Sequence, residues 1–417
     1  MRLSNFVVLI FIVVAASCDT AGNVDPVYKE NFIKYYGKAG AQSGADLLVN
    51  ENGEMFLLGN SIAPSGVTTG FIVKVDKFGN VLAQRQVGGD NETSVDVEFI
   101  RSGAEEGDLV VVNNVGSESN SNIRIIRLSK DDLGGIDSLL VVPAGDLVNG
   151  MKRVARSVTS LSDAGGFLIT GYADKDLTEE TNPVDPTTDQ NDLLALHVDD
   201  ALLQVTNAMS VGGERTGALV KAFEVPSDSL PLVMFGYSDK PVDVSFELNY
   251  TFYLPDSDIL AAGASVGTTT QEEELASVAA SEDGKFFLMA GTSRAPGSSA
   301  GDIYLVKYGF SFDLRTLDKR VELNRNVVCV DADFASGTNY IILANEVSAD
   351  NIDDILIVKV NHNGEPIWTR TFGTDGGDDT GAAIAALPDG RIAVLGTIEL
   401  ETNKKLALMV LNNRGEL

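Results

Sequence analysis

One short motif in the chain matches a catalytic signature by its spacing. The run GSSAG at 297–301 fits the G-x-S-x-G pattern of serine hydrolases, with Ser299 as the nucleophile. That chemistry needs a strand before the serine, a helix after it and a histidine base. The chain has only two histidines, His197 and His362, and the run lies in a Gly/Ser-rich stretch between two strand-like segments. We therefore predict a loop here and assign no catalytic residues.

Acidic clusters are the other candidates for chemistry. They read GGDNE from residue 88, QEEE from 271, ADNIDD from 349 and DGGDD from 375. Oxygen ligands at this density could bind Ca²⁺, but no stretch has the spacing of an EF-hand. Paired carboxylates for glycoside hydrolysis also remain an alternative, because acids are numerous and two of them need only meet in space. We expect a solvated acidic rim and predict no metal site or cofactor, with Ca²⁺ as the one alternative. Two histidines and two separate cysteines also disfavour zinc.

Cys18 ends the apolar segment with which the chain begins, MRLSNFVVLIFIVVAASC. Arg2 precedes an apolar run over residues 6–16, which is short for a membrane span and typical of a secretory signal. The run AASC resembles the lipobox of bacterial lipoproteins, although Ala15 stands where leucine is usual. We therefore predict a signal peptide over residues 1–17, a lipid anchor on Cys18 and a tether over residues 18–30.

The composition limits the partners. Asp and Glu number 60 against 31 Lys and Arg, which gives a net charge of −29 and disfavours nucleic acid. The second cysteine, Cys329, lies in the apolar run VVCVDADF and reads as a small buried side chain. If Cys18 is acylated, no disulfide can form within the chain.

A repeated apolar run indicates how the chain is organised. Seven such runs, most of them ending in a small residue, begin at roughly 50- to 65-residue intervals, the length that four strands with their loops require. They are EMFLLGN at 54, LVVVNN at 109, GFLITGY at 166, PLVMFGY at 231, FFLMAGT at 286, YIILANE at 340 and RIAVLGT at 391. A second run rich in β-branched and aromatic residues follows each one, so strands are favoured over helices. We predict four strands per unit, which we call a, b, c and d.

The two ends of the chain predict how the units close. The C-terminal LNNRGEL supplies a strand c and a turn with no strand d after it, whereas NFIKYYG at 31–37 is a strand without a unit. Phe32 then takes the place of Trp368, and Tyr36 that of Phe372. We predict an all-β, seven-bladed β-propeller over residues 31–417, with four-stranded antiparallel blades and the N-terminal strand completing the last blade. Phe32, Ile33, Tyr35 and Tyr36 are expected to be buried there.

The repeat resembles that of uncharacterised seven-bladed propeller lipoproteins of Gram-negative bacteria. Their unit reads KVDxxGNxxW followed by FGG, and here Lys74, Val75, Asp76, Gly79 and Asn80 match it. A second match comprises Lys359, Gly364, Trp368, Phe372 and Gly373. The resemblance implies the architecture and says little about activity. Trp368, the only tryptophan, is accordingly assigned to blade packing.

Turn lengths separate the two sides of such a ring. The a–b and c–d turns are short, whereas the b–c and d–a loops are long and acidic, the longest spanning residues 172–191. We place any ligand on this b–c/d–a face. The segments GAD at 44, ELAS at 274 and TGAA at 380 indicate small, plain side chains near the channel mouth.

Two functions follow from these observations. The first is a monomeric, non-catalytic binding or scaffold propeller, anchored by its lipid in the bacterial cell envelope. Its partner is an envelope protein or glycan, and the outer membrane or cell surface is favoured over the inner membrane. The second is a propeller enzyme acting on glycans or peptides, with carboxylates at the channel mouth.

Overall fold

A computed structural model describes residues 30–37, 40–117, 120–141, 153–162, 165–173, 192–202, 205–211, 217–225, 232–239, 246–254, 259–268, 270–281, 283–310, 315–335, 338–348 and 352–417. The chain divides into two compact units, Met1–Glu30 and Asn31–Leu417. Of the first unit only Glu30 is described, so the predicted signal peptide and nearly all of the tether lie outside the described residues. The same holds for most of the long loop at 172–191.

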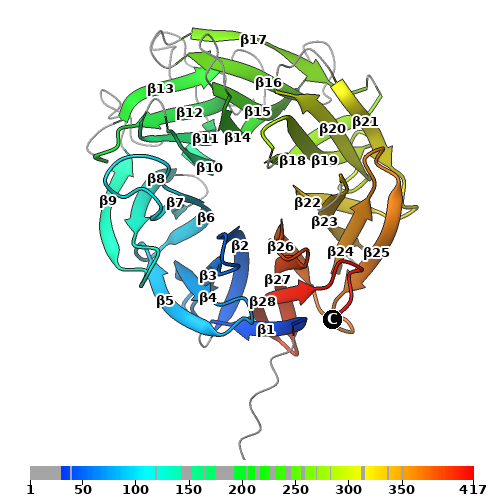
Figure 1. Cartoon of the computed structure of the whole chain (residues 1–417), viewed down its shortest axis with the longest axis horizontal. Coiled ribbons are helices and arrows are strands. Elements are labelled where there is room, and N and C mark those ends of the chain that lie inside the picture. The colour runs from blue at the N-terminus through cyan, green and yellow to red at the C-terminus, as the bar shows by residue number, and fades with distance from the viewer. Residues whose placement is uncertain are drawn as a thin grey trace, which may run out of the picture. The chain divides into compact units, whose positions relative to one another are not determined.

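The described part of the second unit contains 28 strands and is all-β (Figure 1). The first three sheets comprise β2 (Ala41–Val49), β3 (Met55–Ile62), β4 (Thr68–Val75), β5 (Val81–Val87); β6 (Glu92–Phe99), β7 (Leu109–Ser117), β8 (Asn120–Leu128), β9 (Gly135–Val141); and β10 (Arg153–Ser160), β11 (Phe167–Ala173), β12 (Asp192–Val198), β13 (Val205–Val211).

Three further sheets follow in chain order. They comprise β14 (Gly217–Glu224), β15 (Leu232–Asp239), β16 (Phe246–Leu254), β17 (Ile259–Val266); β18 (Glu272–Ala280), β19 (Phe286–Arg294), β20 (Asp302–Gly309), β21 (Arg315–Val321); and β22 (Val327–Phe334), β23 (Tyr340–Val347), β24 (Asp353–Val360), β25 (Pro366–Phe372).

The last sheet joins the two ends of this unit. It contains β26 (Thr380–Ala386), β27 (Ile392–Leu400) and β28 (Asn403–Leu411), and β1 (Phe32–Tyr36) adds to it as the outermost strand. β1 pairs antiparallel with β28, with Phe32 opposite Val410 and Tyr36 opposite Leu406. The described strands therefore form seven four-stranded antiparallel sheets around one axis. The predicted blade type and the completion of the last blade by the N-terminal strand are confirmed.

The predicted repeat places the strands, but details of the prediction were wrong. Strand a of the first blade was expected from Asp46 and begins five residues earlier, at Ala41. In β1 only Phe32 and Tyr36 are buried, whereas Tyr35 is 47% exposed and Ile33 is half-buried. The period-2 alternation of an outermost strand explains the difference, because successive side chains point to opposite faces.

The core lies between the blades. Strands b and c are buried along most of their length, as in β3 and β24, because each blade covers a face of its neighbour. One apolar cluster joins the last blade to the first and contains Phe32 and Tyr36. Trp368 packs at the edge of another cluster, which confirms its assignment to blade packing.

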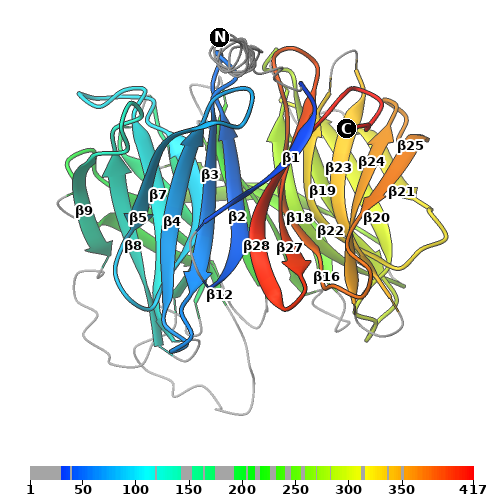
Figure 2. The same ribbon diagram turned by 90° about the horizontal axis from the view of Figure 1, so that it is seen from below.

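The c–d turns repeat one geometry. Gly79, Gly364 and Gly415 each have φ of 73°, a conformation that favours glycine. In each turn the side-chain oxygen of an Asp or Asn accepts two backbone N–H groups from the turn residues, as Asp76 does from Phe78 and Asn80 at 2.9 and 2.8 Å. The a–b and c–d turns lie on one side of the ring and the b–c and d–a loops on the other, with the strands running between them (Figure 2). No helix among the described residues is long and apolar enough to cross a membrane.

Candidate functional site

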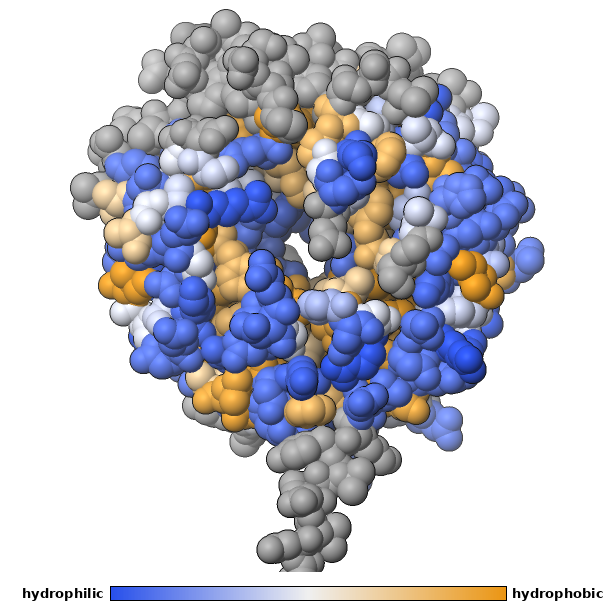
Figure 3. All heavy atoms as spheres, in the orientation of Figure 1, coloured by the Kyte–Doolittle hydropathy of each residue, from blue (hydrophilic) through white to orange (hydrophobic). Residues whose placement is uncertain are grey.

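The innermost strands surround the axis of the ring, and Figure 3 shows an opening at its centre. Each of these strands has a register shift at the same place. We call the residue that follows the shift the channel position of its blade. Bulges of this kind re-aim a side chain. In blade order the channel positions are Asp46, Asp96, Ser157, Lys221, Ser277, Asp331 and Ala383.

Carboxylates at the channel positions bond to the backbone of the next blade. Asp46 Oδ2 accepts the N–H of Val97 at 2.9 Å, and Asp96 Oδ2 accepts that of Val158 at 2.8 Å. The inner edge of strand a has no strand paired beside it, so its N–H groups need another acceptor. The acids supply it and thereby connect one blade to the next.

The same arrangement recurs on the opposite part of the ring. Asp331 Oδ2 accepts the N–H of Ile384 at 2.8 Å, and Ser277 donates its hydroxyl to Asp331 Oδ1 at 2.5 Å. Two residues further along, Asp333 Oδ2 accepts the N–H of Ala386 at 2.9 Å. Asp331 occupies the place in its blade that Asp46 and Asp96 occupy in theirs, so this pattern belongs to the repeat.

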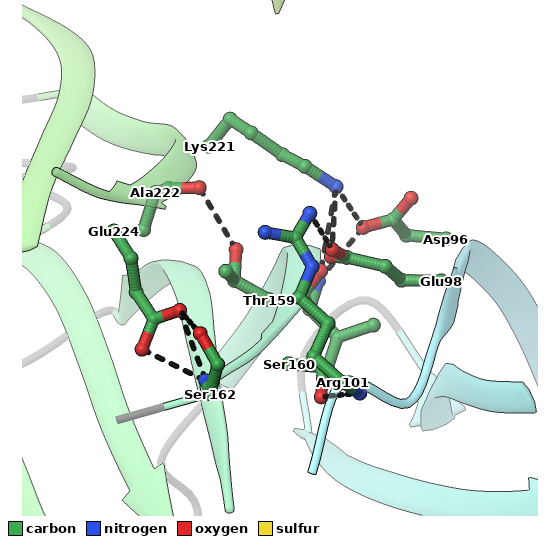
Figure 4. Close-up of polar contacts among 10 residues, drawn as sticks. Asp96, Glu98, Arg101, Thr159, Ser160, Ser162, Lys221, Ala222 and Glu224 are labelled. Atoms are coloured by element: carbon green, nitrogen blue, oxygen red, sulfur yellow. Dashed lines mark hydrogen bonds and ion pairs between the residues drawn. The ribbon is translucent and has the colours of Figure 1, made fainter. Parts of the chain in front are cut away.

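Lys221 is the cation of this cluster (Figure 4). Its Nζ donates to Asp96 Oδ2 at 2.9 Å and to the carbonyl of Val158 at 3.3 Å, and it lies 3.8 Å from Glu98 Oε2. It thus extends from the fourth blade across the third to the second. Arg101 forms a second ion pair with Glu98, at 2.6 Å between Nη2 and Oε1.

Burial changes the ionisation of the acids. It raises the pKa of Asp46 well above its ordinary value, and the adjacent Asp96 raises this pKa further. Burial likewise raises the pKa of Glu98 and of Asp331, and it raises the pKa of Asp333 to about 7. At neutral pH the Asp333 carboxyl group is therefore protonated in part of the molecules.

Lys221 keeps its charge in this environment. Burial by itself lowers the pKa of Lys221, but Asp96, Glu98 and Asp46 outweigh that effect and hold the pKa above its ordinary value. A built-in ammonium group thus already occupies the place that a bound cation would take. The cluster can hold the blades together without any ligand.

The prediction of a plain channel mouth was wrong in part. Ser277 and Ala383 are small, as ELAS at 274 and TGAA at 380 predicted, whereas GAD at 44 ends in Asp46. The prediction also overlooked strand a of the other blades. The alternating acids in SVDVEF at 94–99 and VDADF at 330–334 were the available signal. A strand with charged residues at every second position, between two glycine-rich loops, places those charges on one face.

The expectation that the acidic loops form a solvated rim was also wrong in part. Glu92, Glu273 and Asp379 are buried at equivalent places where strand a begins. Asp379 accepts the hydroxyl of Thr374 at 3.1 Å and the N–H of Glu399 at 2.6 Å. These acids hold the d–a loops in place, because a buried loop N–H or hydroxyl needs an acceptor.

A second candidate surface lies on the b–c/d–a face. A hollow of about 450 Å³ is formed there by the d–a loop after the sixth blade and the b–c turn of the seventh, and its lining includes Asp375, Glu399, Asn403 and Lys405. It therefore offers acidic, amide and basic groups together. Among the described residues, no three His, Cys, Asp or Glu side chains are grouped so as to hold a metal ion. The Ca²⁺ alternative remains a prediction.

The residues considered for catalysis are far from a triad arrangement. Ser299 lies in the exposed loop between β19 and β20, with no helix after it, as predicted. His197 belongs to β12, where its Nε2 is 3.1 Å from the carbonyl oxygen of Gly165. His362 lies in the turn after β24. Three separate elements in different blades hold these side chains.

Comparison with known proteins identifies the fold and no family. No model of a protein family matches the chain, and no curated protein matches it. It is similar to the β-propeller domain of Cps50 (Swd1) from Myceliophteria thermophila, with a TM-score of 0.51, 10% identity, and coverage of 90% of this chain and 99% of that one. It is also similar to the uncomplexed acylaminoacyl peptidase of Pyrococcus horikoshii, with a TM-score of 0.51 and 11% identity. That match covers 91% of this chain and 54% of the peptidase. The described fold and both similarities show that this chain is a β-propeller, and the comparisons do not identify its activity.

Proposed function

We propose that this chain is a non-catalytic binding or scaffold protein, a monomer held at the cell envelope by a lipid on Cys18. The observation that carries the proposal is that acids of the innermost strands bond to the backbone of the next blade. Asp46, Asp96, Asp331 and Asp333 each accept a backbone N–H from the next blade. A general acid or base must exchange its proton with substrate, and an acid committed to the ring's own backbone is poorly suited to that role.

The partner binds on the b–c/d–a face. The hollow at the sixth and seventh blades supports this location, because it combines carboxylates with Asn403 and Lys405 on a rigid base. Groups of both signs and an amide suit an envelope protein or a glycan, which offer hydroxyl, amide and charged groups. The acidic character of the chain disfavours nucleic acid.

Photo-crosslinking tests the location. A photoreactive residue replaces Asp375, which is exposed in the hollow, and in a matched variant it replaces Asn413, which is exposed in a c–d turn. After irradiation of intact cells, we expect a discrete crosslinked species from position 375 and none from 413. Crosslinks confined to position 413 would place the partner on the opposite side and contradict the proposal.

The anchor is tested separately. The apolar run over residues 6–16 and AASC before Asp19 support it. The outer membrane or cell surface is the proposed location. We expect Cys18→Ser to abolish processing and to release the protein from the membrane fraction, whereas the control Cys329→Ala leaves both unchanged. A Cys18→Ser protein that is still processed and membrane-bound would show that no lipid on Cys18 is needed.

One observation favours the enzyme as a second candidate. Glu98 is buried, its Oε2 makes no hydrogen bond, and burial raises its pKa, as is common for catalytic acids. Hydrolysis of a glycan or peptide would then depend on this side chain. Purified protein that turns over such a substrate, and loses the activity in Glu98→Gln with its melting temperature kept, would favour the enzyme over the scaffold.

A further inference from the structure

Exposed apolar side chains recur at one place in the ring, immediately after the c–d turn. Five of the eight large hydrophobic residues exposed in the described part of the chain lie there. Val81 and Leu82 are 53% and 51% exposed, Ile136 is 40%, Ile367 is 51% and Leu417 is 55%. We call these five residues the apolar corner. Figure 3 shows hydrophobic patches separated by polar surface along the rim.

The strand registers show that these places are equivalent. Val75 pairs with Val81, and Val360 pairs with Pro366, the residue before Ile367. In the second blade Leu128 pairs with Gly135, the residue before Ile136. Leu417 follows the turn of the last blade, in which Asn412 N–H donates to Glu416 O at 2.9 Å.

The apolar corner occupies four consecutive blades. Its members belong to the sixth, seventh, first and second blades, which adjoin one another around the ring. In the fifth blade the register places Arg315 and Thr316 at the equivalent positions, and both are exposed and polar. The described side chains of the fifth blade therefore do not continue the feature, and the four blades that carry it form one sector of the rim.

The chain enters the propeller in the middle of this sector. Asn31 precedes Phe32, which pairs with Val410 beside the last c–d turn. Residues 19–30 connect this point to Cys18 and reach at most about 40 Å when fully extended. A lipid on Cys18 would hold this sector, more than any other, close to the bilayer surface.

We propose that the apolar corner rests in the interface of the bilayer that holds the anchor, so that the b–c/d–a face is directed away from the membrane. This inference rests on the lipid anchor of the proposed function. Single side chains spaced over four blades suit lipid, into which each can insert alone, whereas a protein interface needs a contiguous patch. The net charge of −29 repels anionic headgroups, so the bilayer surface that fits is zwitterionic.

Depth-dependent quenching tests the orientation. The full chain is purified from membranes and reconstituted in phosphatidylcholine vesicles that contain a nitroxide-labelled quencher lipid. A fluorophore is attached at Leu82→Cys or Ile367→Cys, and in a matched control at Ile62→Cys. Ile62 is 44% exposed and ends β3 on the opposite side of the ring. Buried Cys329 does not compete for the label.

We expect fluorescence at positions 82 and 367 to fall about twofold or more in vesicles with quencher, and fluorescence at position 62 to stay unchanged. With the reporter at Ile136→Cys, the double variant Leu82→Ser/Ile367→Ser should lose most of the quenching and still float with the vesicles. If the protein floats with the vesicles but quenching is equal at positions 62 and 82, this inference is wrong and the lipid anchor is still supported. Failure of the wild-type chain to float overturns both.

Discussion

Asp333, an acid of the innermost strand β22, allows the role of such acids to be measured. Its side chain accepts the N–H of Ala386 at 2.9 Å and that of Phe334 at 2.7 Å, and burial raises its pKa from 3.8 to about 7. Between these two pH values the unfolded chain releases the proton and the folded protein keeps it. Folding therefore becomes less favourable as the pH rises through this window, and the full cost is present above pH 7.

The magnitude follows from the difference between the two pKa values. A difference of about three pH units corresponds to about 4 kcal/mol, of which about 2 to 3 kcal/mol is lost between pH 5 and pH 8. Asp333→Asn removes this dependence of stability on pH. It also puts an NH₂ group in the place of one of the two accepting oxygens, so one hydrogen bond worth about 1 kcal/mol is lost. We expect the variant to be within about 1 kcal/mol of wild type at pH 5, and to gain about 2 to 3 kcal/mol relative to it by pH 8.

Thermal unfolding monitored by circular dichroism at pH 5, 6, 7 and 8, at constant ionic strength, provides the measurement. For an unfolding entropy of about 2 cal/mol/K per residue, the relative gain corresponds to about 3 °C in Tm. Asp375→Asn, at an exposed loop carboxylate, is the control and should show no pH-dependent difference from wild type. A difference between Asp333→Asn and wild type that is the same at every pH would refute the reasoning.

Three further predictions concern other parts of the ring. Deleting residues 19–30 should leave the melting temperature nearly unchanged. Deleting residues 19–37 should expose β28 and cause aggregation or a loss of more than about 5 kcal/mol in the free energy of unfolding. Two monomeric truncations that melt at the same temperature would contradict the closure of the ring by β1. Cys329 should react with a thiol reagent only after denaturation, because burial raises its pKa; rapid labelling of the native protein would be the opposite result. Lys221→Met leaves buried acids without their cation. Denaturant unfolding should show a loss of about 3 to 5 kcal/mol in the free energy of unfolding at pH 8 and a smaller loss at pH 5. A loss that is the same at both pH values would indicate a packing defect alone.

Much of the architecture could be predicted because it depends on short sequence patterns that recur in each blade. The apolar run of strand b, the turn residues around Gly79 and the acidic loop each have a direct physical reading, and their recurrence predicts a blade. The spare strand at 31–37 and the missing strand at the C-terminus predicted the pairing of β1 with β28, and the structure adds the register that places Phe32 opposite Val410. The exposure of Tyr35 was not predicted, because a short outermost strand carries too little pattern to show which face is covered.

The candidate site depended on contacts between segments far apart in the chain. Asp96 and Lys221 are 125 positions apart, and only the curvature of the ring brings them within 2.9 Å. The sequence shows both as ordinary charged residues in strands. Their pairing, and the burial that raises the pKa of Glu98, follow from the convergence of seven inner strands on one axis.

The sequence by itself therefore determined the strands, their turns and the partner of the N-terminal strand, since these depend on side-chain periodicity and on residues adjacent in the chain. Only the tertiary structure decided which acids are buried and what they bind. The free energy of a carboxylate depends on the water removed from it and on the N–H groups and charges around it. Those neighbours come from other blades, so no local pattern in the chain contains them.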